Sequence, residues 1–425
     1  MHSRKYINIF ILAFICRFAW MLFSGLDYTD GADYSRYERI SNLLLQGDVD
    51  PTTEIFILAP LFPLFSSICK FITPGGYWPI TLQLLQISLS SLSVVYLSRT
   101  AYIIFKTTSV AIITGILYSF LFPFYYWSHL ASQESIFQSL FIFAIYHITK
   151  YASTLNTRSL VLFATFYTLS ILTKSHVAVL LPGFLFIIFI KQPTLSRKII
   201  HSIVVLSLIF IINLPYGLFT LFKYNSFVLS SNGSGAYFYF GHNEGFYEYI
   251  AETPPLNSPR FLELQSMDFP SMSIDNIESF EYGERQKILF NRGLEWSAQN
   301  PAKLAHLFIY NLVNHLRPGY AFRFRPLDYK IILVNFIMFS IYLPAYIEIY
   351  RSIPKWKFHL PMLIIVFAML LFSLIFYSQN RFRNITVDPI YLIYASPLIS
   401  SNISNLIKLF SIKKHKLKPQ LPQLR

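Results

Sequence analysis

Long apolar runs, separated by short polar segments, occupy most of the chain. A helix needs about 20 mostly apolar residues to cross the ~30 Å hydrocarbon core of a membrane. By that measure the pattern predicts an all-α integral membrane protein with about ten transmembrane helices. They lie at roughly 6–25, 79–98, 108–128, 133–149, 159–173, 176–190, 199–222, 329–350, 358–378 and 389–407.

The two short runs 159–173 and 176–190 are divided by the polar sequence Thr173-Lys174-Ser175-His176. One continuous helix over 159–190 would be about 48 Å long, which is too long for the hydrocarbon core. We therefore expect two short helices joined by a tight turn at Lys174.

Composition supports the membrane class. Hydrophobic residues make up 54% of the 425 residues and charged residues only 13%, so a water-soluble surface could not be built. The two cysteines, Cys16 and Cys69, exclude a disulfide framework and a cysteine-rich metal site. No Walker A motif, dinucleotide fingerprint or HExxH motif occurs. The net charge of +14 would suggest nucleic acid only on a soluble protein, so we expect no nucleic-acid partner.

The positions of Lys and Arg orient the chain, because short cytoplasmic loops of membrane proteins are enriched in both. With both termini in the cytoplasm, the short basic loops and the basic tail 408–425 fall on the inner side, where Glu348 is the one acid. The outer side then receives two long segments, 26–78 and 223–328, which carry nearly all the acids. We therefore divide the chain into residues 1–222, the outer region 223–328, the helices of 329–407, and the tail.

The first outer segment opens with aspartates, including Asp30 and Asp33, just past the first apolar run. Asp33 is placed either to cap a helix over about 34–46 or to act in chemistry. That helix has an apolar stripe and is expected to lie in the membrane interface. The stripe consists of Tyr37, Ile40, Leu44 and Leu45.

Three further polar features fall on the same outer side. Glu134 opens an apolar run, where it complements the helix dipole or serves a site. Lys174, between two short runs, either binds an anion or extends to the membrane surface. Arg381 and Arg383 could clasp a phosphate, whether of a substrate or of a lipid headgroup. A carboxylate with several cations suits transfer of a group from a lipid phosphate, because the leaving phosphate needs cations and the acceptor needs a base.

The second outer segment begins with a stretch rich in glycine and aromatic residues, 231–249. Glycine lowers helix stability, so we expect this stretch to be a poor helix within an otherwise α-rich region. Its asparagine and aromatic side chains suit a polar, ring-shaped ligand.

Six segments resemble, in this order along the chain, motifs of the GT-C superfamily of lipid-phosphate-dependent glycosyltransferases. The resemblance is greatest to the bacterial branch related to protein mannosyltransferases and the lipid A aminoarabinose transferase. The segments are DYSRYERISNLLLQG, LAPLFPLF, SQESIFQSLFIFAI, ILTKSHVAVLLP, GSGAYFYFGHNEGFY and RFRNITVDPIYLIYAS. Two departures are the lysine at position 174, where the family usually has arginine, and His242, which separates Gly241 from Asn243.

The resemblance implies roles for individual residues. Asp33 takes the place of the catalytic aspartate that deprotonates the acceptor, and Tyr37 and Glu134 support it. The donor phosphate is expected on Lys174, Arg381 and Arg383. The sugar or acceptor pocket is assigned to Asp30, His176, Gly241, His242, Asn243 and Tyr247.

The resemblance also implies a GT-C fold, an undecaprenyl-phosphate-linked sugar donor and inversion at the sugar carbon. The acceptor is a glycan, lipid or protein. No cofactor or metal ligand is assigned, although family members differ in their need for a divalent cation. The glycosylation sequons at Asn232 and Asn384, on the outer side, favour a bacterial inner membrane with a periplasmic active site.

Two alternatives remain open at this point. One is a polysaccharide ligase or polymerase that uses polyprenyl-linked oligosaccharides. The other is a flippase or transporter, which would require a charged residue within the spans. Arg17 is the main residue of that kind, and we expect it to lie near a helix end or to be paired across the bundle.

Overall fold

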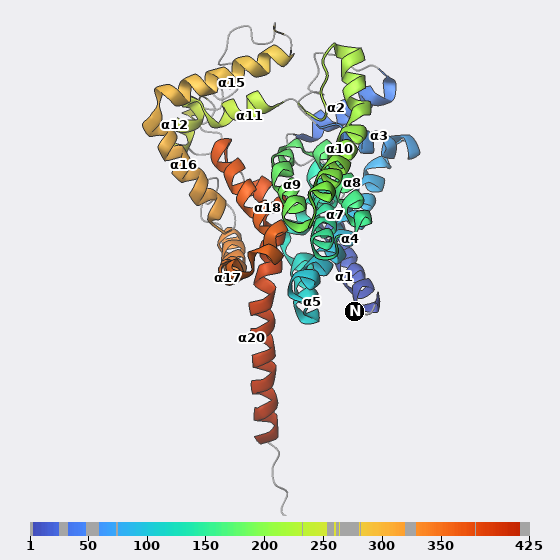
Figure 1. Cartoon of the computed structure of the whole chain (residues 1–425), viewed down its shortest axis with the longest axis vertical. Coiled ribbons are helices and arrows are strands. Elements are labelled where there is room, and N and C mark those ends of the chain that lie inside the picture. Colours follow the sequence, from blue (N-terminus) through green and yellow to red (C-terminus); the bar gives the residue numbers. More distant parts are fainter. Residues whose placement is uncertain are drawn as a thin grey trace, which may run out of the picture.

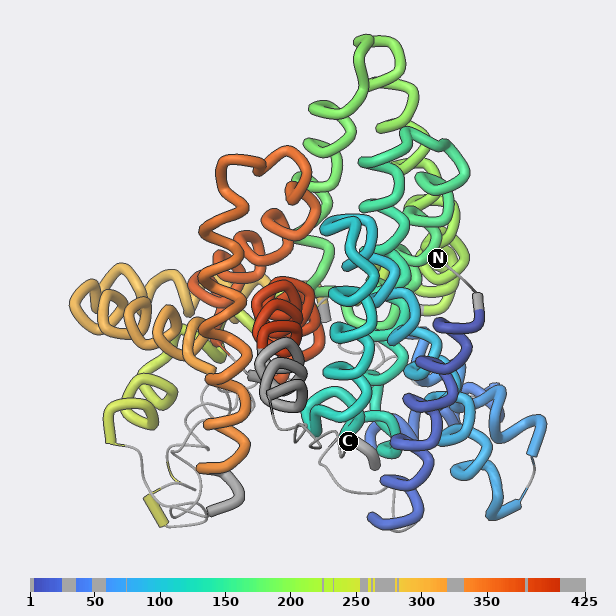
Figure 2. The backbone as a smooth tube through the Cα atoms, turned by 90° about the horizontal axis from the view of Figure 1, so that it is seen from below, coloured from blue at the N-terminus to red at the C-terminus, as the bar shows by residue number. Residues whose placement is uncertain are grey.

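The computed structural model of the chain describes residues 3–24, 33–47, 59–73, 75–231, 233–252, 259–260, 263, 280, 282–318, 329–378 and 380–416. Helices are the regular elements of this part of the chain, which confirms the predicted all-α fold. Figure 1 shows their arrangement, and Figure 2 shows the same backbone from below.

The N-terminal half consists of α1 (Ser3–Ser24), α2 (Asp33–Gln46), α3 (Leu61–Ile72), α4 (Trp78–Phe105), α5 (Thr108–Phe120), α6 (Phe122–Tyr125), the 3-10 turn η2 (Tyr126–Ser128), α7 (Gln133–Thr154), α8 (Thr157–Thr173), η3 (Ser175–Leu180), α9 (Leu181–Lys191) and α10 (Leu195–Tyr224). The remainder consists of α11 (Ser234–Gly241), α12 (Glu244–Glu252), α15 (Tyr282–Gln299), α16 (Pro301–Leu316), α17 (Tyr329–Ser352), η6 (Ile353–Lys355), α18 (Trp356–Ile375), α19 (Asn380–Thr386) and α20 (Asp388–Lys416).

The ten ranges predicted to span the membrane lie mainly in helices, but these helices differ in length. Among the described residues, four stretches are long and apolar enough to cross a membrane: Arg4–Ser24, Trp78–Phe105, Leu195–Lys223 and Ile332–Ile375. A bent pair, 108–120 with 122–128, makes a fifth if it is counted as one span. The count of ten therefore stays a prediction.

The predicted span 108–128 is not one helix. It bends by 71° after Phe120, where Leu121 has an extended backbone. Pro123 gives the reason, because a proline has no N–H for the helical hydrogen bond and its ring crowds the preceding turn. The prediction of a continuous helix was wrong here. The bend carries α6 and η2 across the end of α5, toward the start of α7.

The predicted break at Lys174 is confirmed. Lys174 has an extended backbone between α8 and η3, and the chain then turns back along α8. The Tyr167 hydroxyl donates to the Val177 carbonyl at 2.8 Å, and the Phe163 and Phe184 rings lie 4.9 Å apart. These contacts join residues before the turn to residues after it, and the later residue lies farther along as the earlier one lies farther back, as in an antiparallel hairpin.

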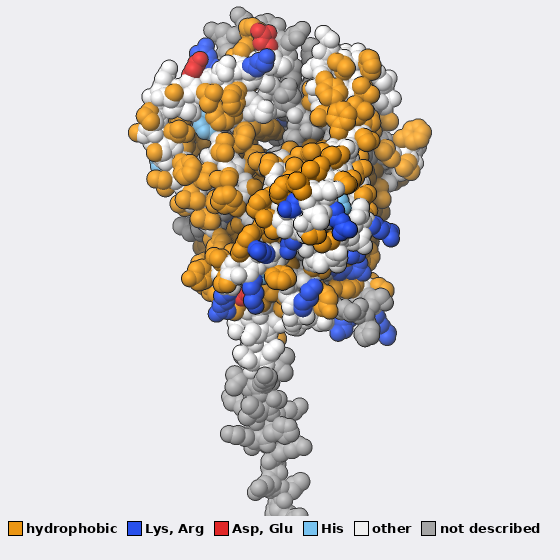
Figure 3. Space-filling model, in the orientation of Figure 1, with side chains coloured by type: hydrophobic (Ala, Val, Ile, Leu, Met, Phe, Trp, Pro, Cys, Tyr) orange, Lys and Arg blue, Asp and Glu red, His pale blue; other side chains and the backbone are white. Residues whose placement is uncertain are grey.

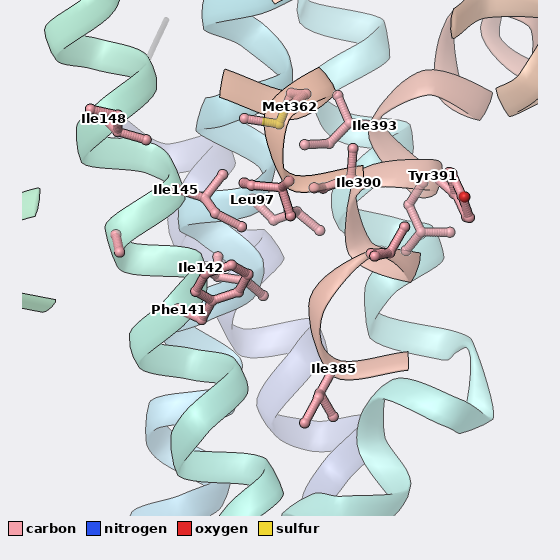
Figure 4. Close-up of a cluster of buried hydrophobic side chains, with 14 of the residues drawn as sticks. Leu97, Phe141, Ile142, Ile145, Ile148, Met362, Ile385, Ile390, Tyr391 and Ile393 are labelled. Atoms are coloured by element: carbon pink, nitrogen blue, oxygen red, sulfur yellow. The ribbon is translucent and has the colours of Figure 1, made fainter. Parts of the chain in front are cut away.

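The hydrophobic core lies where α4, α5 and α7 meet α18 and α20. Figure 4 shows Leu97, Phe141 and Ile145 from the first group facing Met362 and Ile390 from the second, and all five are buried. The start of α20 is thus inside the core, whereas its C-terminal part extends away from the other helices (Figure 1). This packing fixes the segment 380–388 against the beginning of α7.

The helix predicted over 34–46 is present as α2. Its stripe packs on α3, with the Tyr37 and Phe62 rings 4.8 Å apart and Ile40 fully buried. Ser67 donates to the Ser41 carbonyl at 3.0 Å, which fastens the two helices together. Both helices belong to the first outer segment, and the placement of α2 in the membrane interface stays a prediction.

Residues 234–252 form α11 and α12, so the expectation of a poor helix was wrong. Two glycines of α11, Gly235 and Gly241, allow other parts of the backbone to approach the helix closely. A Cβ at Gly235 would lie 1.9 Å from the Gln286 carbonyl oxygen, and one at Gly241 would lie 1.8 Å from that of Phe376. The tertiary contact therefore stabilises a helix that glycine alone would disfavour. With α15 and α16, these helices form a lobe beside α18 (Figure 1).

Helix α16 has its polar side inward and its apolar side outward. Asn311, Asn314 and His315 are buried, whereas Ile309 and Val313 are 59% and 57% exposed. Asn314 Nδ2 donates to the Ser378 carbonyl at 2.8 Å, and Asn311 Oδ1 accepts from the Ser378 backbone N–H at 3.1 Å. Polar contacts thus hold α16 to the connection between α18 and α19. An apolar outer face is typical of a helix in contact with lipid.

Charge is unevenly distributed over the surface. Most of the lysine and arginine side chains seen in Figure 3 lie on the lower half of that face, the end that carries the N-terminus in Figure 1. The lobe of α11, α12 and α15 lies at the opposite end. This distribution agrees with the basic inner side and the acidic outer side read from the sequence.

Candidate active site

Glu134 lies in the first turn of α7, where the sequence predicts it. Ser132 precedes the helix with an extended backbone, so the chain enters α7 directly from the turn after η2. The Glu134 side chain is fully buried. A carboxylate at a helix N-terminus is stabilised by the helix dipole, but burial on this scale also requires a cation.

Two cations supply that charge. Lys174 Nζ lies 2.5 Å from Glu134 Oε1, and Arg381 Nε donates to the same oxygen. The three residues come from the start of α7, the break between α8 and η3, and α19. Gln138 Nε2 also donates to the Asn384 carbonyl at 3.2 Å, which fixes α19 against α7. The fold thus brings together three of the residues that the sequence assigned to the site.

Aromatic rings surround this ion cluster. The Lys174 ammonium lies 5.2 Å from the Phe382 ring centre, and the Arg381 guanidinium lies 5.7 Å from that of Trp127. The His176 ring lies 5.2 Å from Phe137 and 5.0 Å from Phe382. Rings of this kind exclude water and strengthen the electrostatic attraction within the cluster.

Several polar atoms at the cluster are shielded from solvent and make no hydrogen bond within the described part of the chain. They are Glu134 Oε2, both ring nitrogens of His176, and Trp127 Nε1. Buried polar atoms are normally hydrogen-bonded. These atoms are therefore the ones that the site offers to a polar ligand.

The structure does not bring Arg383 to this cluster. Residues two apart on a helix point in nearly opposite directions, and α19 turns Arg383 away from Arg381. Arg383 is buried and donates to Asp388 Oδ1 at 3.0 Å, to the His315 carbonyl at 3.0 Å and to the Asn314 carbonyl at 3.2 Å. The expected pair of arginines is thus divided between a partly exposed cluster and a buried ion pair.

Asp30 and the Asp33 side chain lie outside the described residues. Asp33 is the first residue of α2, and Tyr37 one turn later is buried. Tyr37 and Ile40 belong to the same buried apolar cluster as Ala131 and Ile136, which flank Glu134 in the sequence. The helix that begins at Asp33 and the start of α7 therefore share one apolar cluster, to which Phe62 of α3 and Leu82 of α4 also belong.

The remaining predicted pocket residues lie in the lobe. His242 Nδ1 donates to the Phe238 carbonyl at 2.9 Å, and its ring stacks on Phe238 with centres 4.1 Å apart. Asn243 Nδ2 donates to the Tyr239 carbonyl at 2.9 Å. Burial lowers the pKa of His242 below its ordinary value, so the ring is neutral at pH 7. With Gly241, these residues connect α11 to α12 and pack it on α18.

Tyr247 faces a second polar group within the lobe. The Lys303 ammonium lies 5.0 Å from its ring centre, and Lys303 also pairs with Glu244. Trp296 Nε1 donates to Glu244 Oε2 at 2.9 Å. Desolvation opposes ionisation of Glu244, but the hydrogen bonds from Lys303 and Trp296 outweigh it and lower its pKa. Within the part of the chain that the structure describes, no contact joins this group to Glu134, so Tyr247 is not brought into the cluster there.

Sequence reasoning missed Trp127, Phe382 and Asp388. Asp388 and Phe382 stand inside the quoted segment RFRNITVDP, and Trp127 precedes the turn that leads to Glu134. The available signal for Asp388 was an acid directly before a long apolar run, five residues after an arginine. The two aromatic residues gave no signal, because aromatic residues are frequent throughout the chain. Among the described residues, no group of three or more His, Cys, Asp or Glu side chains could hold a metal ion.

Comparison with known families bears on the first half of the chain. Residues 59–216 match the model of the family described as dolichyl-phosphate-mannose-protein mannosyltransferase. The match supports membership of the GT-C superfamily. The GT-C resemblance seen in the motifs is confirmed at this level. The matched range contains Glu134 and Lys174, whereas Asp33 and Arg381 lie outside it.

Comparison with solved structures finds ArnT from Cupriavidus metallidurans. With ArnT bound to undecaprenyl phosphate, the chain has 15% identity and a TM-score of 0.43, over 100% of this chain and 84% of that one. With the apo state of ArnT, the values are 15% and 0.42, over 100% and 83%. The comparison with curated protein sequences finds no match.

Proposed function

We propose that this GT-C membrane protein transfers a sugar from a polyprenyl-phosphate-linked donor to an acceptor hydroxyl at the periplasmic face of a bacterial inner membrane. The observation that carries the proposal is the convergence of Lys174 and Arg381 on one buried carboxylate, Glu134. The three residues come from segments far apart in the sequence, and all three stand in motifs that resemble those of the superfamily.

Lys174 and Arg381 have the chemistry to hold the donor phosphate. An arginine offers a planar set of donors to phosphate oxygens, and a lysine adds a point charge. The Arg381 side chain is 32% exposed, so a ligand can reach it from outside the cluster. Arg383, which the sequence placed in the same role, is buried in its own ion pair and is assigned to positioning α19 instead.

The transfer step follows from these groups. The acceptor oxygen forms a bond to the sugar carbon, and the bond from that carbon to the phosphate oxygen breaks. The bonding electrons leave with the phosphate, whose charge is stabilised by the two cations. The acceptor proton goes to a base, for which Asp33 is proposed, since it begins the helix whose Tyr37 and Ile40 share a buried apolar cluster with Ile136 near the start of α7. Attack opposite the leaving phosphate inverts the sugar carbon.

Substitution of Asp33 tests the assignment of the base. We expect Asp33→Asn to abolish sugar transfer by the purified protein while expression and thermal stability stay at wild-type levels. Glu38→Gln, an isosteric change of an acid on the same helix, is the control and should retain transfer. If purified Asp33→Asn retained near wild-type transfer, Asp33 would not be the base.

The two alternative functions make different predictions. A ligase or polymerase would use oligosaccharide carriers in preference to single-sugar carriers, so a donor assay with both separates it from the proposed transferase. A flippase or transporter would need an accessible charge within the spans. Arg17 is fully buried and its Nε donates to Ser90 Oγ at 2.7 Å, so it is paired across the bundle, as expected from the sequence.

A further inference from the structure

The turn that connects η2 to α7 is buried, although it is not helical. Ser128, His129, Leu130 and Ala131 are each at most 5% exposed. Buried carbonyl groups need hydrogen-bond donors, which a helix would supply from its own backbone. Within the turn, the Ser132 N–H donates to the Leu130 carbonyl at 2.8 Å. Further donors must come from outside the turn.

Two glutamine side chains of α4 are such donors. Gln83 Nε2 donates to the His129 carbonyl at 2.8 Å. Gln86 Nε2 donates to the Leu130 carbonyl at 2.7 Å and, more weakly, to that of Ser128 at 3.4 Å. Residues three apart lie on the same face of a helix, so one face of α4 holds three consecutive carbonyl groups.

Both glutamines are fully buried in a helix that is long and apolar enough to cross a membrane. A polar side chain in such a helix is costly unless its hydrogen bonds are made. The Oε1 atoms of Gln83 and Gln86 accept no hydrogen bond from the described part of the chain, so the cost is not offset there. Among the described residues, their amide groups donate only to the turn. Holding the turn is therefore the role that their contacts indicate.

The position of the turn determines where α7 begins. The helix starts at Gln133, three residues after Leu130, and Glu134 lies in its first turn. Glu134 Oε1 contacts Lys174 and Arg381, which come from two other segments. A shift of the turn would move Glu134 relative to both cations, whereas the later part of α7 is fixed by the apolar core.

We propose that Gln83 and Gln86 are positioning residues for the sugar transfer. By fixing the turn before α7, they place Glu134 so that it holds Lys174 and Arg381 in the arrangement that binds the donor phosphate. This inference rests on the proposed function and assigns the two glutamines no contact with the substrate. Hydrogen bonds weaken steeply with distance and angle, so a small shift of the turn is enough to weaken the contacts between the cations and the phosphate.

The test compares a polyprenyl monophosphate with the polyprenol, which lacks the phosphate. Dissociation constants of both are measured on the full-length protein in lipid nanodiscs. Gln86→Met keeps the length of the side chain and removes its donor. We expect it to weaken binding of the monophosphate about tenfold, the effect of one hydrogen bond to a charged group, and to leave binding of the polyprenol unchanged.

The ratio of the two dissociation constants distinguishes positioning from a general loss of structure. A merely structural defect would lower the fraction of protein that binds either lipid and would leave this ratio unchanged. A wild-type ratio in Gln86→Met would therefore overturn the inference.

Gln192→Met is the matched control. Gln192 is also buried, and its Nε2 donates to the Tyr151 hydroxyl at 2.8 Å near the C-terminal end of α7, the end opposite the turn. The same substitution there should leave the ratio unchanged. If Gln86→Met does not fold, Gln83→Met, which removes a single hydrogen bond to the turn, repeats the test with the same expectation. Failure of both variants to fold would make the glutamines structural and refute the positioning role.

A double variant shows whether Gln86 acts through Glu134. In the Glu134→Gln background the turn no longer places a carboxylate between the cations. Gln86→Met should therefore weaken binding of the monophosphate much less there than in the wild-type protein. Equal effects of Gln86→Met in both backgrounds would contradict the proposal.

Lys174→Met separates this inference from the proposed function, because it removes one of the cations. It should weaken binding of the monophosphate and leave that of the polyprenol unchanged. If it changes neither, the phosphate site itself is wrongly placed, and the proposed function loses its support. If it weakens binding of the monophosphate but Gln86→Met does not, the phosphate site stands and the positioning role is refuted.

Discussion

Replacement of Arg383 by methionine tests the division between the two arginines of α19. Arg383 is buried, and its guanidinium connects Asp388 at the start of α20 with the last carbonyl groups of α16. Methionine keeps much of the volume and removes the charge. Arg381, two residues earlier, is partly exposed and contacts Glu134, which keeps Lys174 as a second partner.

The magnitude follows from what each substitution leaves behind. Arg383→Met leaves the Asp388 carboxylate buried without its cation, and breaking a buried pair in this way costs about 3–5 kcal/mol. Asp388→Asn should cost a similar amount. The double variant leaves no lone charge, so its loss should be smaller than the sum of the single losses, by about 0.5–3 kcal/mol. Arg381→Met should cost less than Arg383→Met, because Glu134 remains neutralised.

Unfolding of the purified variants in mixed micelles of a denaturing detergent gives these free energies, and a transfer assay on the same samples gives activity. We expect Arg383→Met to lose stability, and Arg381→Met to keep most of its stability and lose transfer. The reasoning would be refuted if Arg383→Met unfolded like the wild-type protein while losing transfer. Strictly additive effects of Arg383→Met and Asp388→Asn would also contradict the ion pair.

Three further predictions concern the lobe and its surroundings. Gly241→Ala should destabilise the lobe by about 1–3 kcal/mol or more, because the added Cβ meets the Phe376 carbonyl oxygen. Gly283→Ala is the control and should be tolerated, because its Cβ meets no atom within 4 Å. Thermal unfolding of the two variants compares their stability. Burial lowers the pKa of His242 in the folded state below its ordinary value of 6.5. The free energy of unfolding should therefore decrease as the pH falls below 6.5, and it should decrease less in His242→Phe, which has no group to protonate. In a background without native cysteines, Ile309→Cys should resist labelling by a membrane-impermeant maleimide if the outer face of α16 contacts lipid. Ala302→Cys, at an exposed position in the first turn of α16, is the control and should be labelled. Equal labelling of both would place the outer face of α16 in water.

Local sequence accounts for most of the helices, because an apolar run in a membrane must satisfy its own backbone hydrogen bonds. It also accounts for the break at Lys174, since the combined run is too long for the hydrocarbon core. It failed at Leu121, where the bend depends on Pro123, and at α11. There, glycine predicts a loop by propensity, but contacts of Gly235 and Gly241 with two distant carbonyl groups stabilise a helix.

By itself the sequence determined the membrane class and the helical fold, because these depend on the local order of apolar and polar residues. The side on which the polar clusters lie stays a prediction from the positions of lysine and arginine. It also pointed to Glu134, Lys174 and Arg381 through their motifs. Only the tertiary structure decided that these three meet on one carboxylate oxygen and that Arg383 belongs elsewhere. Contacts between residues 40 to 247 positions apart depend on how helices pack. Arg381 and Arg383 have different partners because a helix turns them to different sides.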